Sequence, residues 1–308
     1  MPTLAVALIA LVSLTQAPTA NSQVGAAQAP VASAKAEIER LIALSGAEVS
    51  VVYRPLNALD GATVRGAGDE ILIGPDVVYH AASTMKVPVM IELFRQVDGG
   101  TVKLSDTVVV SNIFHSIVDG SEFTLGTSEE VDGAAHRSLG KPMSLRDLCE
   151  EMITISSNLA TNVLMEKLGV ERVRATVTRL KAPGMKVLRG VEDQKAFDKG
   201  MSNETTARAL MTLLTAIGNG SAASKASCDE MLAILKRQKF NDGIPAGLPP
   251  GTPVAHKTGT ITKIHHDAAI VYGAHPYVLV VMTRGMADEK KSDLLIAEIA
   301  RLINELAS

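Results

Sequence analysis

Ser83 and Lys86 form the pattern S-x-x-K, which places a hydroxyl and an amine three residues apart. If a helix begins near Ser83, residues i and i+3 lie on one face, so the amine can reach the hydroxyl. A serine beside such a group has the arrangement of an activated nucleophile. The residues from Val87 to Phe94 are almost all apolar and predict a buried helix that holds this turn rigidly.

A second polar motif, Ser156-Ser157-Asn158, follows Ser83 by 73 residues. Ser144 with Asp147 has the pattern of a capping box opening one helix, and a new helical pattern runs from Leu159 to Leu168. The triplet therefore lies at a helix junction, where side chains can point into a cleft. Simple N-capping by Ser157 or Asn158 is the other interpretation.

The third motif, His256-Lys257-Thr258-Gly259-Thr260, ends a predicted strand. Lys257 supplies a cation beside the Thr258 and Thr260 hydroxyls, which suits an anionic carboxylate. Gly259 lets a substrate backbone approach closely. The alternative is an edge strand that carries an ordinary solvated lysine.

These motifs need elements to position them, and hydrophobic periodicity indicates which ones. Both chain ends show strands and a helix, whereas most of the middle is helical. The predicted elements are a helix over 35–44, strands over 48–54, 254–258, 268–272 and 277–283, a turn at Asp60-Gly61 and a helix over 288–306. The predicted fold class is α/β (α+β), an antiparallel sheet built from both chain ends with flanking terminal helices and an inserted all-helical lobe. We expect a sheet lobe formed by 33–82 together with 236–308, a helical lobe over 83–235, and a cleft between them.

The composition excludes several classes of function. The 308 residues are 46% hydrophobic, enough for a sizeable core. Lys plus Arg (30) nearly balance Asp plus Glu (33), so no strong field favours nucleic acid. Only 3% of residues are aromatic, which weakens a role in stacking on bases or sugars.

The first 34 residues carry no charged side chain, and an apolar run over 4–14 is too short to span a bilayer. Residues 1–29 are predicted to be a signal peptide, although a positively charged start is missing. A disordered N-terminal tail is the alternative. Export would place the protein in the periplasm or outside the cell, with no stable membrane span after processing.

The two cysteines, Cys149 and Cys228, are too few for a disulfide framework, and a bridge between them is left open. The adjacent His265 and His266 do not predict a metal site, because neighbouring side chains on a strand point to opposite faces. No cofactor or metal is expected.

The order and contexts of the three motifs, S-x-x-K, S-x-N and K-T-G, resemble the penicillin-recognising serine enzymes, and among them class A β-lactamases. The resemblance runs from about Lys35 to the end of the chain. It includes the segment Asp267 to Val271 after K-T-G and the Thr205-Thr206 pair that opens a helix after a long loop.

Two departures from the family pattern stand out. Ser157 replaces the aspartate usual in the second motif. In the long loop the family has a glutamate two residues after an arginine and an asparagine four further on, whereas here Glu192 comes three after Arg189 and Ala196 takes the asparagine position. Asp193 therefore competes with Glu192 as the base, and a solvated loop carboxylate is the other interpretation of Glu192.

The resemblance implies hydrolysis of a β-lactam, a small-molecule substrate, by a monomer. Ser83 would attack the strained carbonyl after Lys86 or a glutamate-bound water takes its proton. Ser156 would relay that proton to the leaving nitrogen, and Glu192 would activate the water that hydrolyses the acyl-enzyme.

Substrate binding would fall to the remaining motif residues. Asn158 would hold the acyl side-chain amide, and Lys257 with Thr258 and Thr260 would bind the carboxylate. The backbone N–H groups of Ser83 and Thr260 would form the oxyanion hole.

Other functions remain open on the sequence. A D-Ala-D-Ala carboxypeptidase or another serine hydrolase of the same fold would share the three motifs. A penicillin-binding sensor without turnover would stay acylated, and a glutaminase-type relative would share S-x-x-K.

Overall fold

A computed structural model describes residues 20–56 and 70–308 of the chain, with side chains from residue 30 onward. The turn expected at Asp60-Gly61 lies outside the described residues, as does most of the leader expected over 1–29. Among the described residues, no helix combines the length and apolar character that crossing a bilayer requires.

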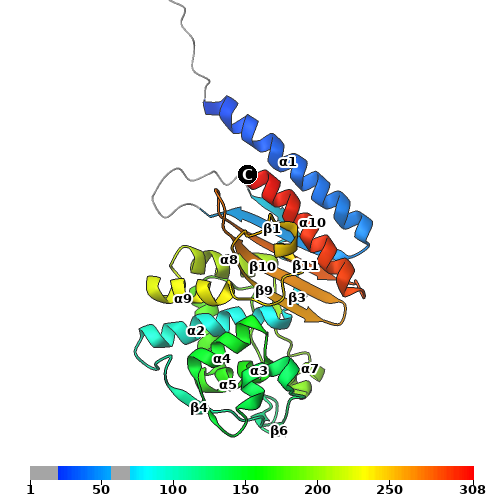
Figure 1. Ribbon diagram of the computed structural model, residues 1–308. Helices are drawn as coiled ribbons and strands as arrows, with labels where there is room; N and C mark the ends of the chain where they lie inside the picture. Colours follow the sequence, from blue (N-terminus) through cyan, green and yellow to red (C-terminus); the bar gives the residue numbers. More distant parts are fainter. Residues whose placement is uncertain (1–19, 57–69) are drawn as a thin grey trace, which may run out of the picture.

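The centre of the fold is an antiparallel five-stranded sheet in the order β2-β1-β11-β10-β9 (Figure 1). Its strands are β1 (Glu48–Pro55), β2 (Ile71–Ile73), β9 (Val254–Ile261), β10 (Ile264–Val271) and β11 (Tyr277–Arg284). β1 pairs with β11 over its whole length, from Glu48 opposite Arg284 to Pro55 opposite Tyr277. Seven of the eight residues of β11 are buried, because helices cover both faces of the sheet and leave no solvent side for alternate polar residues.

Two helices from opposite ends of the chain cover one face of the sheet, α1 (Ala20–Ser45) and α10 (Glu289–Ala307). They lie side by side in Figure 1, blue and red. The side chain of Asp288 caps α10 by accepting a hydrogen bond from the Lys291 backbone N–H. Ile296, Ile299 and Ile303 recur at helical spacing and are buried against the sheet.

The other face packs against a helical lobe, which contacts the sheet through α8 and α9. The remaining helices are α2 (Lys86–Asp98), α3 (Glu129–Arg137), α4 (Leu145–Thr154), α5 (Asn158–Leu168), α6 (Val170–Arg179), α7 (Gln194–Asp198), α8 (Ala207–Gly218), α9 (Lys225–Leu235) and the 3₁₀ turns η2 (Ala82–Met85) and η3 (Ile244–Gly247). Short strands join parts of this lobe: β3 (Tyr79–His80) with β8 (Glu204–Thr205), β4 (Thr107–Val109) with β7 (Pro142–Ser144), and β5 (Phe114–His115) with β6 (Glu122–Phe123).

The predicted fold class is confirmed, since strands from both chain ends form one antiparallel sheet with terminal helices and a helical lobe between them. The limits of the two lobes, 33–82 with 236–308 and 83–235, stay predictions. β10 begins four residues before the predicted start at Ala268. The strand includes His265, His266 and Asp267, whose side chains are polar although they are buried. An apolar run therefore does not mark the start of this strand.

Cys149 in α4 and Cys228 in α9 are both buried free thiols. Burial raises the pKa of each thiol. The bridge that the sequence left open is therefore not formed, and both side chains pack as small apolar groups.

Candidate active site

Ser83 lies on the short 3₁₀ turn η2, directly before α2 begins at Lys86. The buried Thr84 fixes this turn, because its hydroxyl donates a 2.6 Å hydrogen bond to the Ala81 carbonyl. Ala82 has a left-handed backbone with φ 45°. Ser83 lines two adjoining hollows of the cleft, which also share Asn158 and Thr260.

Lys86 is fully buried under the cleft, and its Nζ contacts the second motif. It donates hydrogen bonds to the Ser156 carbonyl (2.5 Å), the Ser156 hydroxyl (3.1 Å) and Asn158 Oδ1 (2.9 Å). Within the described part of the chain, no hydrogen bond joins Lys86 to Ser83. The spacing of S-x-x-K thus places the two residues on one turn, while the partners of the amine come from α5 and the residues before it.

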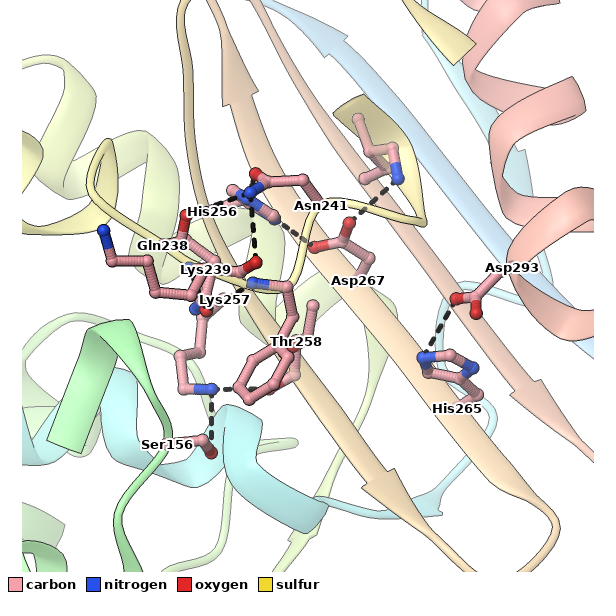
Figure 2. A network of polar contacts seen from close by, with 12 residues as sticks. Ser156, Gln238, Lys239, Asn241, His256, Lys257, Thr258, His265, Asp267 and Asp293 are labelled. Carbon is pink, nitrogen blue, oxygen red and sulfur yellow. Dashed lines mark hydrogen bonds and ion pairs between the residues drawn. The ribbon is translucent and has the colours of Figure 1, made fainter. Parts of the chain in front are cut away.

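Lys257 on β9 is also fully buried and reaches the same hydroxyl from the sheet (Figure 2). Its Nζ lies 3.0 Å from Ser156 Oγ and 2.9 Å from the Thr258 carbonyl oxygen. A hydroxyl has two acceptor sites, so Ser156 Oγ can accept from both lysines. Ser156 adopts a left-handed backbone, φ 61°, which sets its side chain between the two lobes.

Burial shifts both lysines towards their neutral forms. Desolvation, followed by the neighbouring charge of Lys257, holds the pKa of Lys86 well below its ordinary value. Desolvation also lowers the pKa of Lys257 to about 7, against an opposing effect of Asp267. The sequence led us to expect a fixed cation at Lys257, whereas the structure places there a group that titrates near neutral pH.

Ser157 is the N-cap of α5, its hydroxyl accepting from the Ala160 N–H at 3.0 Å. The same hydroxyl donates to Asp132 Oδ1 at 2.7 Å. Asp132, on α3, also accepts from the Leu159 N–H (3.1 Å) and the Thr127 hydroxyl (2.7 Å). A buried carboxylate therefore does stand beside the second motif, but α3 supplies it.

Gly259 allows β9 to approach η2 closely. A Cβ at this position would lie 3.0 Å from Thr84 Cγ2 and 3.2 Å from both Ala82 Cβ and the Ser83 backbone nitrogen. From the sequence we expected the glycine to admit a substrate backbone; the structure shows that the protein's own turn occupies this space. The close approach brings the strand that carries Thr260 against the turn that carries Ser83, as a shared oxyanion hole requires.

Glu192 lines the first hollow, together with Ser83 and Asn158. Its Oε1 accepts a 3.0 Å hydrogen bond from Asn158 Nδ2. Asn162 binds both backbone groups of Val191, accepting from its N–H at 2.7 Å and donating to its carbonyl at 2.9 Å. That clamp and the left-handed backbone of Glu192, φ 63°, accommodate the additional residue between Arg189 and the glutamate.

Asp193 faces away from the cleft and is buried. Its Oδ1 accepts from the Ser116 hydroxyl at 2.8 Å and caps α7 through the Ala196 N–H at 3.1 Å. Its Oδ2 accepts from the Ile117 N–H at 3.0 Å. Of the two carboxylates that the sequence left in competition, Glu192 is therefore the one that lines the cleft.

A polar network crosses the sheet behind Lys257 (Figure 2). His256 Nδ1 lies 3.0 Å from Asp267 Oδ1, and its Nε2 lies 3.2 Å from Asn241 Oδ1. His265, by contrast, pairs with Asp293 of α10 at 3.3 Å. The contact between His256 and Asp267 joins β9, which carries Lys257, to β10, whereas the contact of His265 joins β10 to α10.

Asp132 and Asn162 were not singled out from the sequence. Both act on backbone or hydroxyl groups far away in the sequence, so no local spacing indicates them. The one available signal was the serine at position 157 in place of the motif aspartate, because a buried hydroxyl needs an acceptor for its proton.

The chain is similar to known proteins over most of its length. Residues 33–307 match the family described as "Beta-lactamase enzyme family". A β-lactamase of Streptomyces albus G is 26% identical over 257 residues, which cover 78% of this chain and 76% of that protein.

Solved structures agree with this assignment. A β-lactamase from Sphaerobacter thermophilus superposes with a TM-score of 0.74 at 25% identity, covering 91% of this chain and 97% of that one. PBP-A gives 0.73 at 26% identity, covering 89% and 95%. An ancestral class A β-lactamase has the same fold, with a TM-score of 0.73 at 24% identity and coverage of 88% and 99%. With the match spanning residues 33–307, the chain belongs to the β-lactamase enzyme family.

Proposed function

We propose that this protein hydrolyses β-lactams by a class A-like route, through an acyl-enzyme on Ser83. The observation that carries the proposal is the meeting of Lys86 and Lys257 on the hydroxyl of Ser156, in a cleft that Ser83 and Glu192 also line. The family and the fold support a β-lactam hydrolase.

Acylation needs a base for the Ser83 proton and a route to the leaving nitrogen. Burial holds the pKa of Lys86 well below its ordinary value, so its amine gives up a proton more readily than an ordinary lysine and is assigned here as the base. In this proposal Lys86 takes the proton and the hydroxyl of Ser156, which Lys86 contacts, passes it to the lactam nitrogen as the ring opens. The attacking oxygen forms the ester bond while the carbon–nitrogen bond breaks.

Binding of the lactam carboxylate is assigned to Lys257, Thr258 and Thr260. An anion near Lys257 Nζ favours the protonated amine, which offsets the desolvation that lowers its pKa. Asn158 would use its amide for the acyl arm, although Lys86 and Glu192 already occupy both ends of this amide in the free protein.

Deacylation is assigned to Glu192, which would take a proton from the water that attacks the ester. Glu192→Gln keeps the length of the side chain and its acceptor oxygen towards Asn158 but removes the base. We expect Ser83 to be acylated at nearly the wild-type rate, while release slows by about 10² to 10⁴-fold. Intact-mass spectrometry after mixing with a chromogenic cephalosporin would then show an accumulated adduct.

Asp193→Asn is the matched control, because the adjacent carboxylate serves the loop and not the cleft. It is expected to lower stability without trapping an adduct, and Ser83→Ala should give no adduct at all. If Asp193→Asn traps the adduct and Glu192→Gln does not, the assignment of the base is wrong.

A second candidate is a penicillin-binding enzyme that turns over D-Ala-D-Ala peptides or esters. The observation that favours it is the similarity to PBP-A, a point mutant of which has been solved as an acyl-enzyme complex with penicillin G. A wild-type protein that stays acylated by penicillin and cleaves a D-Ala-D-Ala peptide would establish this function instead.

Export is the natural setting for either activity, and we propose that residues 1–29 direct it. Mass spectrometry of the protein recovered from the periplasm or the medium would test the proposal. An intact N-terminus on protein confined to the cytoplasm would contradict it.

A further inference from the structure

Arg189 is a buried cation in the wall of the cleft. Its side chain lines the hollow that also contains Ser83 and Glu192, yet the residue is only 7% exposed. Its Nη1 donates to the neighbouring Gly190 carbonyl at 3.1 Å, and its buried Nε has no hydrogen-bond partner. Among the described residues, no carboxylate lies within ion-pairing distance of this guanidinium.

The acidic residues nearby are engaged elsewhere. Asp193 bonds Ser116 and two backbone N–H groups, and Glu204 pairs with Lys186 at 2.8 Å. Glu192 accepts from Asn158. The guanidinium also lies over the ring of Phe197, whose centroid is 5.4 Å from the guanidinium carbon.

Burying a guanidinium without a counter-ion is costly, and such a group is satisfied best by a carboxylate, which it can bind in a bidentate manner. Burial already lowers the pKa of Arg189 from its high ordinary value, and the charge of Asp193, which lies beyond ion-pairing distance, opposes this only in part. Since the side chain borders the cavity of Ser83, the natural source of the missing anion is the molecule bound there.

The two hollows are assigned to opposite ends of the bound substrate. Thr258 and Ser156 line the second hollow, where the lactam carboxylate is assigned, and Arg189 does not. Arg189 lines the first hollow with Glu192, His80 and Asn203, and Asn158 and Thr260 line both hollows. With the carboxylate in the second hollow, the acyl arm is assigned to the first. Glu192 lines the same hollow and disfavours an anion beside it, so attraction to the guanidinium must outweigh this repulsion.

We propose that Arg189 forms a carboxylate subsite for the acyl arm, so that the preferred substrates carry a second negative charge on that side of the scissile amide. The inference rests on the proposed function, because it takes the acyl arm to lie in the first hollow. A carboxylate on the acyl side of the scissile amide occurs both in β-lactams with an acidic acyl arm and in D-Ala-D-Ala peptides with an acidic side chain.

The test measures second-order rate constants for acylation of Ser83 by two penicillins that differ in one group. Benzylpenicillin and α-carboxybenzylpenicillin differ only by the acyl-arm carboxylate, and α-aminobenzylpenicillin provides the opposite charge. We expect Arg189→Gln to lower the ratio of the carboxylated to the unsubstituted rate about tenfold, as loss of a charge-assisted bond should. Arg189→Lys should retain most of the ratio because it keeps the charge.

Lys195→Gln is the matched control, since it removes one positive charge from the same loop. Lys195 pairs with Asp119 and lies outside the hollow, so the ratio should not change. A second arm repeats the measurement with two acyl-D-alanyl-D-alanine peptides that differ by one side-chain carboxylate. A fall of the ratio in either series supports the subsite. The series that responds shows whether the carboxylate belongs to a β-lactam or to a peptide.

The outcomes separate the two proposals. If the wild type is acylated but Arg189→Gln changes the ratio of carboxylated to unsubstituted rates by less than twofold in both the penicillin and the peptide series, the subsite alone is overturned. A wild type that none of the probes acylates would overturn the proposed function, and the subsite with it. A general loosening of the loop would slow all probes equally and leave the ratio unchanged, which also counts against the subsite.

Discussion

Asp132 offers a direct test of how the second motif is held in place. Its carboxylate is only 2% exposed and accepts hydrogen bonds from the Ser157 hydroxyl, the Leu159 N–H and the Thr127 hydroxyl. Asp132→Ala would leave two of these donors, on Ser157 and Leu159, buried without an acceptor. At about 1–3 kcal/mol for each unsatisfied donor, the free energy of unfolding should fall by about 2–6 kcal/mol.

Asp132→Asn should cost far less. Its amide oxygen can accept from Ser157 and Leu159, while its NH₂ group can donate to Thr127, whose hydroxyl already lies 3.3 Å from His136 Nδ1. We expect a loss of about 1 kcal/mol. Urea unfolding followed by circular dichroism would measure both variants, with Asp119→Asn on the exposed surface as the control.

Unfolding of Asp132→Ala and Asp132→Asn at the same urea concentration as the control would refute this role of Asp132.

A second measurement tests the effect of the Asp132 charge on Lys86. Asp132 favours the protonated form of Lys86, so Asp132→Asn should lower the pKa of Lys86 further. On the acidic side of the pH–rate profile, acylation should then begin to rise at lower pH. A rise that begins at higher pH would contradict the role of neutral Lys86 as the base.

Three further changes test the site. Gly259→Ala places a methyl group 3.2 Å from the Ser83 nitrogen, so it should cost about 1–3 kcal/mol of stability and slow acylation, and normal rates would contradict the tight approach of strand and turn. Lys257→Ala should slow carboxylate-bearing lactams about tenfold more than a neutral ester, whereas equal losses would place Lys257 in the chemistry or the fold. The folded-state pKa of Lys257, about 7, lies below its ordinary value near 10.4, so between these values the unfolded chain holds a proton that the native protein has released. The free energy of unfolding should therefore rise from about pH 7 towards about pH 10.4, and less so in Lys257→Met; a flat wild-type profile would contradict the shift.

The sequence was informative where one property dominated a segment. Apolar runs located β1 and β11. The cap at Ser144 located the start of α4, and the helical pattern that stops at Leu168 located the end of α5. These signals are local, so they survive without knowledge of the fold.

The contacts of the site were less predictable because they join distant segments. Helical spacing placed Lys86 next to Ser83, but the hydrogen bonds of its amine go to residues 70 and 72 positions later. The polar, irregular stretch 105–142 supplies Ser116 to Asp193 and Asp132 to Ser157, and no local pattern indicates either contact. Buried polar pairs of this kind have no periodicity, and only the tertiary fold brings them together.

The pairing of β1 with β11 also constrains when the protein can become active during synthesis. β1 is made early, but its partner ends at Arg284, so this edge of β1 stays unpaired until almost the whole chain exists. Contacts between such distant segments form slowly, and unpaired edges favour aggregation in the meantime. The strand that carries Lys257 ends at Ile261, and only β10 lies between it and β11, which begins at Tyr277. The second lysine of the cleft is therefore made shortly before the strand that closes the sheet. A ribosome-bound chain that stops before residue 254 would have Ser83 and Lys86 but no completed cleft around them.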